Sequence, residues 1–205
     1  MAKAPKTSGT TTPKTEYIPE GKHYAVVSMI ADLWTQFVQS KEYGDRNVRQ
    51  LYVMRELPEI KHVFSEDKGK QSVVFGNTYT FSMWKKAKLR SVVENILGKP
   101  FKDDDVAEDY DVADLIGRSC KLNMVHNGDY VNIFSIIDCE TDPKIKPELE
   151  QKSVFLDDFD SNTFGTLPNW LQDKIRLSPE YNAVAWNKPT ETISPSDSSE
   201  VEMPF

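Results

Sequence analysis

The sequence is poor in the residues that disulfide and zinc chemistry require. Its 205 residues include only two cysteines, Cys120 and Cys139, and three histidines, His23, His62 and His126. No pair among them has the CxxC or HxxxH spacing of a zinc site, so we expect no bound metal. The two cysteines fall in one predicted hairpin but out of register, which favours reduced thiols over a disulfide.

Long apolar runs and the usual phosphate-binding or nucleophile motifs are also absent. No stretch approaches the roughly 20 apolar residues that span a bilayer. The initial "MAKAPKTSGTTTPKTEY" has no apolar segment of the signal-peptide kind. There is no Gly-rich phosphate loop and no G-x-S-x-G motif. We therefore expect a protein without a membrane contact, a cofactor or an enzymatic activity.

One feature offers an enzymatic alternative, the acidic stretch "KDDDVAEDYD" at residues 102–111. Clustered carboxylates bind magnesium in nucleases. These acids are nearly consecutive, however, and they lack both the spacing of a calcium loop and a basic residue placed for phosphoryl transfer. Solvated charge is the preferred interpretation.

Positive charge is scarce overall but concentrated in one region. The net charge is -7 and the isoelectric point about 5.1. Residues 41–102 nevertheless carry 13 Lys and Arg against 7 Asp and Glu, whereas residues 103–140 carry 2 against 10. An acidic chain with a basic middle suits a protein that binds one polyanion without adhering to all of them.

Alternation of apolar and polar residues predicts three strands in the first half of the chain. The segments are "HYAVVSMIADLWTQFV" (23–38), "RNVRQLYVMREL" (46–57) and "SVVFGNTYTFSM" (72–83). Pro58 is expected to end the second strand, because proline cannot donate to a sheet ladder.

The period then changes to that of a helix. In "WKKAKLRSVVENILGKPF" (84–101) apolar residues recur at helical spacing, and Gly98 is a natural helix terminator. Farther on, Asn127-Gly128 between two apolar runs predicts a hairpin of two more strands. The resulting order predicts a mainly β fold, a five-stranded OB-fold Greek-key barrel with a helix between strands 3 and 4.

Composition divides the chain around this barrel. Residues 1–16 are expected to be a disordered arm, residues 17–143 the barrel, and residues 189–205 a disordered acidic tail. Residues 144–188 form an extension with a helix predicted from Pro168. That helix is expected to pack on the barrel, or alternatively on a second copy of the chain in a homodimer.

Three segments resemble a family of bacteriophage proteins that we associate with single-stranded DNA-binding proteins of OB-fold type. They are "KAKLRSVVENILGKPF", "DLIGRSCKLNMVHNGDYVNIFSI" and "LPNWLQDKIRLSPEY", and the likeness covers about residues 17–181. The resemblance implies binding and protection of single-stranded DNA during phage replication and recombination, in the cytoplasm of the infected bacterial host. The alternative is a phage structural or assembly protein that uses the barrel to contact other proteins.

The end of the chain, "EVEMPF", is similar to the tip of bacterial single-stranded DNA-binding proteins, although its acidic run is sparser. The likeness implies that replication and recombination proteins are recruited through Glu200, Glu202, Met203, Pro204 and Phe205. An aromatic ring beside a free carboxylate fits an apolar pocket rimmed with Arg or Lys. A chance ending is the alternative.

Binding of a single strand without sequence preference requires cations for the phosphates and flat rings for the bases. The candidate cations lie around the second strand and at the start of the helix: Arg46, Arg49, Arg55, Lys85, Lys86, Lys88 and Arg90. The lysines have the alternative of lining the solvated side of the helix.

The candidate stacking residues are Trp34, Tyr52, Tyr79 and Trp84. Tyr79 shares a strand face with Phe75, which favours core packing. Trp34 and Tyr52 lie on the strand faces opposite those that carry the clearest apolar residues. They therefore either stack on bases or pack against another element of the protein. Trp84 stands at a strand-to-helix junction beside lysines, where stacking and packing are both open.

Overall fold

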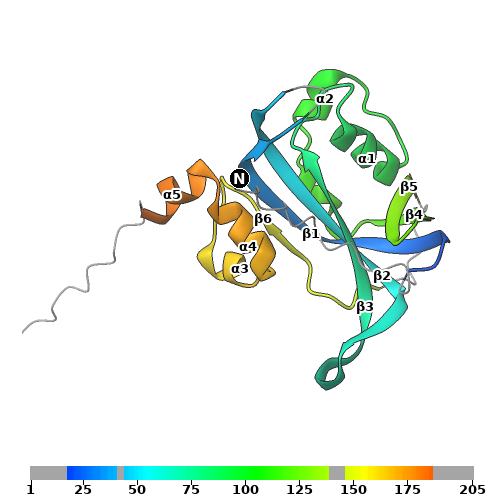
Figure 1. Ribbon diagram of the computed structural model, residues 1–205. Helices are drawn as coiled ribbons and strands as arrows, with labels where there is room; N and C mark the ends of the chain where they lie inside the picture. The colour runs from blue at the N-terminus through cyan, green and yellow to red at the C-terminus, as the bar shows by residue number, and fades with distance from the viewer. Residues whose placement is uncertain (1–17, 41–43, 139–145, 187–205) are drawn as a thin grey trace, which may run out of the picture.

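The computed structural model describes residues 18–40, 44–138 and 146–186, in which strands dominate (Figure 1). The strands are β1 (Gly21–Val38), β2 (Arg46–Ser65), β3 (Gly69–Thr80), β4 (Ser119–Asn127), β5 (Tyr130–Asp138) and β6 (Lys152–Val154). The α-helices are α1 (Lys88–Leu97), α2 (Asp104–Glu108), α3 (Ser161–Gly165), α4 (Asn169–Arg176) and α5 (Pro179–Trp186). Two short 3-10 turns, η1 (Glu66–Lys68) and η2 (Val112–Leu115), complete the set.

The strands form a single sheet in the order β3-β2-β1-β4-β5. Neighbours along this path are antiparallel, and β6 adds to β1 in parallel at Met29–Ala31. Helix α1 contacts both β3 and β5, the two strands at the ends of the sheet. The fold is therefore mainly β, an open sheet consistent with a barrel-like arrangement.

The main core fills the inner side of this curved sheet. Alternate residues of β2 and β3 face inward, and the apolar stripe of α1 packs against them. The buried members from these elements are Leu51, Val53, Leu57, Val73, Phe75, Tyr79, Leu89, Val92, Val93 and Ile96. Gly98 ends α1 at φ +68°, and its N–H bonds to the Glu94 carbonyl, as the sequence predicted.

The sequence-based boundaries need two corrections. The prediction that Pro58 ends the second strand is wrong, because β2 runs on to Ser65. Pro58 falls within a register shift between Leu57 and Lys61, where the ladder is already interrupted. Strand β3 correspondingly begins at Gly69 and ends at Thr80, so that β2 and β3 project together as a long arm (Figure 1).

A second core lies on the outer face of β1 and β2, beneath the C-terminal extension. Residues 152–181 contribute β6, α3, α4 and part of α5, which lie on the side of the sheet away from α1 and α2 (Figure 1). The buried side chains are Met29, Ala31, Leu33, Trp34, Tyr52, Val154, Phe164, Leu167, Leu171 and Ile175. The extension therefore packs on the barrel-like sheet. Within the described ranges, no helix is long and apolar enough to cross a membrane.

Candidate nucleic-acid interface

The structure separates the predicted DNA-binding residues into groups with different surroundings. Arg55 and Tyr79 lie inside the sheet. Trp34 and Tyr52 lie beneath the C-terminal extension. The rest lie near the end of the molecule where β1 meets β2 and where β3 leads to α1.

Arg55 is not available to DNA, contrary to the prediction. Its side chain has no solvent exposure because it alternates with inward-facing Leu51 and Val53. Its guanidinium donates to Asn77 Oδ1 at 3.4 Å and to the Tyr79 hydroxyl at 3.3 Å. The preference for Tyr79 as a core residue is confirmed by its burial.

Trp34 is a buried packing residue, and stacking on DNA is excluded by its position. Its ring lies 5.3 Å from the Phe159 ring and 5.8 Å from the Tyr181 ring, measured between centroids. A bulge between Asp32 and Trp34 gives Trp34 a left-handed backbone with φ +59°. Of the two roles that the sequence left open, covering another element is the correct one.

Tyr52 is likewise covered, by helix α4. Its ring meets the Trp170 ring edge-on at 5.1 Å. A Cβ at Gly76 would lie 1.9 Å from the Tyr52 hydroxyl oxygen, so the tyrosine lies directly over that glycine of β3. Burial raises the pKa of Tyr52 to about 12.

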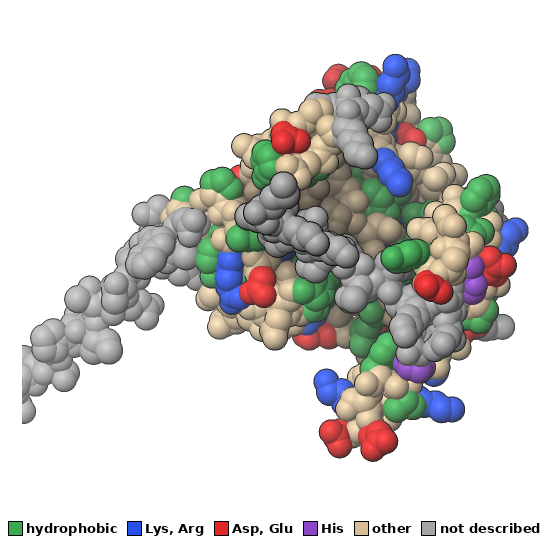
Figure 2. Space-filling view, viewed as in Figure 1, with side chains coloured by type: hydrophobic (Ala, Val, Ile, Leu, Met, Phe, Trp, Pro, Cys, Tyr) green, Lys and Arg blue, Asp and Glu red, His purple; other side chains and the backbone are tan. Residues whose placement is uncertain are grey.

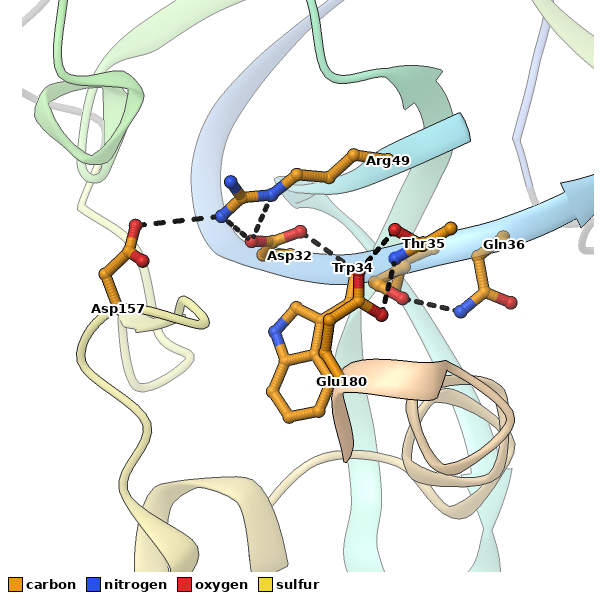
Figure 3. A network of polar contacts seen from close by, with 8 residues as sticks. Asp32, Trp34, Thr35, Gln36, Arg49, Asp157 and Glu180 are labelled. Atoms are coloured by element: carbon orange, nitrogen blue, oxygen red, sulfur yellow. Dashed lines mark hydrogen bonds and ion pairs between the residues drawn. The ribbon is translucent and has the colours of Figure 1, made fainter. Parts of the chain in front are cut away.

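Arg49 is held by carboxylates rather than left open for phosphates (Figure 3). Its Nε donates to Oδ2 of the buried Asp32 at 2.9 Å, and Asp157 lies 3.8 Å away on the extension. Hydrogen bonding to Asp32 raises the pKa of Arg49 above its ordinary value. The guanidinium also stands 5.0 Å from the Phe81 ring centre, so Arg49 orders this end of the sheet.

Neighbouring contacts in Figure 3 join β1 to the helices of the extension. Glu180 of α5 accepts hydrogen bonds from the backbone and the hydroxyl of Thr35. Burial opposes ionisation of Glu180, but these bonds outweigh it and leave its pKa below the ordinary value. Gln36 donates to the Lys174 carbonyl of α4 at 3.0 Å. Arg49 therefore belongs to a polar network that fixes the extension.

Arg90 also has a structural role. Its guanidinium bonds to Glu94 at 3.1 Å and to Asp104 at 2.6 Å, which ties α1 to α2. Other acids of the 102–111 stretch cap backbone groups, since Asp103 accepts from Val106 N and Asp111 from Ala113 N. Among the described residues no group of three or more His, Cys, Asp or Glu is placed to hold a metal ion.

The remaining predicted residues are Arg46, Trp84, Lys85, Lys86 and Lys88. We call residues 84–88, together with Phe37, Arg46 and Phe81, the turn end. Trp84 is 57% exposed and Phe37 is 64% exposed. Lys85, Lys86 and Lys88 are exposed as well, and within the described part of the chain they form no ion pair. The turn end thus combines accessible rings with three exposed lysines that form no ion pair among the described residues.

The parts of this region are connected through the backbone. The Phe81 N–H bonds to the Arg49 carbonyl at 2.8 Å, and Trp84 follows three residues later. Lys86 Nζ stands 5.9 Å from the Trp84 ring centre. On the face viewed in Figure 2 the surface is hollowed below α1 and α2, with Lys or Arg side chains at the margin.

Sequence reasoning missed several exposed rings. Phe64 and Phe134 both sit at register shifts, where a bulge turns an extra side chain outward. Trp170, on α4, is 42% exposed. For Phe64 and Phe134 the sequence carried a signal of exposure, because each is an apolar residue at a position that breaks the alternation of its strand.

Two groups of predicted residues lie outside the described ranges. They are Cys139 and the tail residues Glu200, Glu202, Met203, Pro204 and Phe205. No protein-family model matches the chain, and no curated protein is significantly similar to it.

Proposed function

We propose that this is a sequence-nonspecific single-stranded DNA-binding protein built on an OB-type barrel. The strand order β3-β2-β1-β4-β5, with α1 between β3 and β4 in the chain, is compatible with that five-stranded barrel. The resemblance of three segments to phage single-stranded DNA-binding proteins supports the same assignment. It indicates a role in phage DNA replication and recombination.

The observation that carries the proposal is Trp84 among lysines. A large indole exposed beside Lys85, Lys86 and Lys88 contributes little to the core of the protein. A base stacked on such a ring contributes about 1 to 3 kcal/mol, and the nearby ammonium groups neutralise phosphates. Trp84 supplies the stacking surface, and the lysines set the salt dependence.

The same geometry favours a single strand over a duplex. Flat rings bind the faces of bases, and in a duplex these faces are already stacked on one another. The overall negative charge disfavours nonspecific contact elsewhere on the surface. In this account the acidic tail recruits replication and recombination proteins through residues 200–205.

Two sets of variants test the role of the turn end against fluorescein-labelled oligo-dT. Trp84→Ala is expected to weaken binding by about 5- to 150-fold, because it removes one stacking contact. Lys85→Ala combined with Lys86→Ala is expected to reduce the log-log salt slope by about 1.4, since each phosphate contact contributes about 0.7.

The controls separate this site from general charge and fold. Trp84→Phe should retain most of the affinity, because it keeps a ring. Lys68→Ala with Lys70→Ala removes the same charge from the arm formed by β2 and β3, where Glu66 and Asp67 supply neighbouring negative charge, and should leave the slope nearly unchanged. If turn-end and arm variants behave alike, the turn end is not the DNA site.

A further inference from the structure

Helix α4 presents an exposed tryptophan that the packing of the extension does not account for. The buried side of α4 is formed by Leu171 and Ile175. Trp170 precedes Leu171 at the flank of this side and remains 42% exposed. Lys174 lies one turn farther along the same flank, at the i+4 position, and is only half-buried.

The position of this ring is fixed by β2 and β3. Tyr52 of β2 pairs with Thr78 of β3, and its ring extends across β3 over Gly76. Trp170 then meets Tyr52 edge-on at an interplanar angle of 83°. The indole is therefore held beside the outer face of β3, with a face that Tyr52 does not cover.

The outward residues of β3 between this ring and the turn end have short side chains, and the first of them, Gly76, lies under the Tyr52 ring. Its successive outward residues are Gly76, Thr78 and Thr80, and the chain continues from Thr80 to Trp84. At about 3.3 Å per residue, the eight steps along the chain from Gly76 to Trp84 span at most about 26 Å. Such a span fits the roughly 4 to 16 nucleotides that one OB-type domain covers.

We propose that Trp170 is a second base-stacking subsite for single-stranded DNA, joined to Trp84 by the track of small residues along β3. This inference rests on the proposed function and extends the strand path onto the C-terminal extension. Tyr52 acts as a positioning residue, because it is buried and touches the indole rather than the DNA.

A length series of labelled oligo-dT tests the subsite. Wild-type affinity should rise with length until both rings are occupied. Trp170→Ala should bind the shortest oligonucleotides as the wild type does, and should lose about 5- to 150-fold on the longer ones. Ultraviolet crosslinking to a long oligo-dT should label the peptides that contain Trp84 and Trp170.

Matched variants make the outcomes distinct. Trp170→Phe should restore the dependence on length, and Leu177→Ala, which removes an apolar side chain 81% exposed just after α4, should not alter it. Equal affinity of wild type and Trp170→Ala at every length would overturn the subsite while leaving the proposed function intact. A uniform loss at every length would also overturn it, and failure of the wild type to bind any oligonucleotide would overturn both proposals.

Discussion

Replacing Trp34 with alanine is expected to lower the free energy of unfolding by about 3 to 5 kcal/mol, the usual range for a large buried aromatic. Trp34 has no solvent exposure and is the largest fully buried side chain of the described residues. Its ring packs among Phe159 and Tyr181 of the extension, so its removal opens a cavity between the extension and β1. Alanine would also keep the unfavourable positive φ without the packing that supports it.

Chemical denaturation of three variants measures this effect. Trp34→Phe should cost less than Trp34→Ala, because a ring remains and because the indole Nε1–H has no hydrogen-bond partner in the described structure. Phe37→Ala removes an exposed ring from the same strand and should change stability by about 0.5 kcal/mol or less. A loss below about 1 kcal/mol for Trp34→Ala would contradict the docking of the extension on β1.

The second large effect is expected at Asp32. This buried carboxylate accepts from Trp34 N at 2.9 Å and pairs with Arg49. Asp32→Ala leaves the Trp34 N–H without an acceptor and Arg49 without its nearest counter-charge. Breaking a fully buried pair costs about 3 to 5 kcal/mol. Because the Arg49 side chain is 38% exposed and can be solvated, we expect about 2 to 4 kcal/mol.

Asp32→Asn separates the two contributions. The asparagine oxygen can still accept from the Trp34 N–H but no longer offers a charge to Arg49, so its cost should be about half that of Asp32→Ala. Thermal or chemical denaturation at neutral pH measures both variants. If both variants lose the same unfolding free energy, the effect belongs to the ion pair alone. If neither variant is destabilised, the structural role of the network in Figure 3 is contradicted.

Much of the fold follows from local patterns in the sequence. The three long strands, helix α1 and the β4–β5 hairpin are all marked by alternation, by helical spacing or by turn residues. Strand β6 has only three residues, too few for a periodic signal, and it forms because residues 152–154 lie beside β1. The strand end predicted at Pro58 was wrong because the sequence does not reveal the register shift in which Pro58 lies.

The site was harder to predict because exposure depends on what covers each face. The alternation of apolar residues correctly placed Trp34 and Tyr52 on the outward faces of their strands. Only the tertiary structure shows that the C-terminal extension covers these faces. Arg55 carried a usable signal, since it alternates with Leu51, Val53 and Leu57. The basic excess of residues 41–102 was informative only in part, because Arg49 and Arg90 are paired with acids contributed by other elements.

Lys85, Lys86 and Lys88 of the turn end remain accessible, and the acidic tail offers a competitor for them. If residues 189–205 lie across the basic surface when DNA is absent, their removal tightens binding at low salt, where screening is weak. The tail would then both limit nonspecific contacts and recruit partner proteins.

The most direct test of single-stranded DNA binding is titration of the full-length protein against labelled oligo-dT and the matching duplex, at two salt concentrations. We predict preferential binding of the single strand, with a log-log salt slope of about -0.7 for each phosphate neutralised. Absence of binding to either oligonucleotide at low salt would contradict the proposal and favour a protein that uses its sheet to contact other proteins.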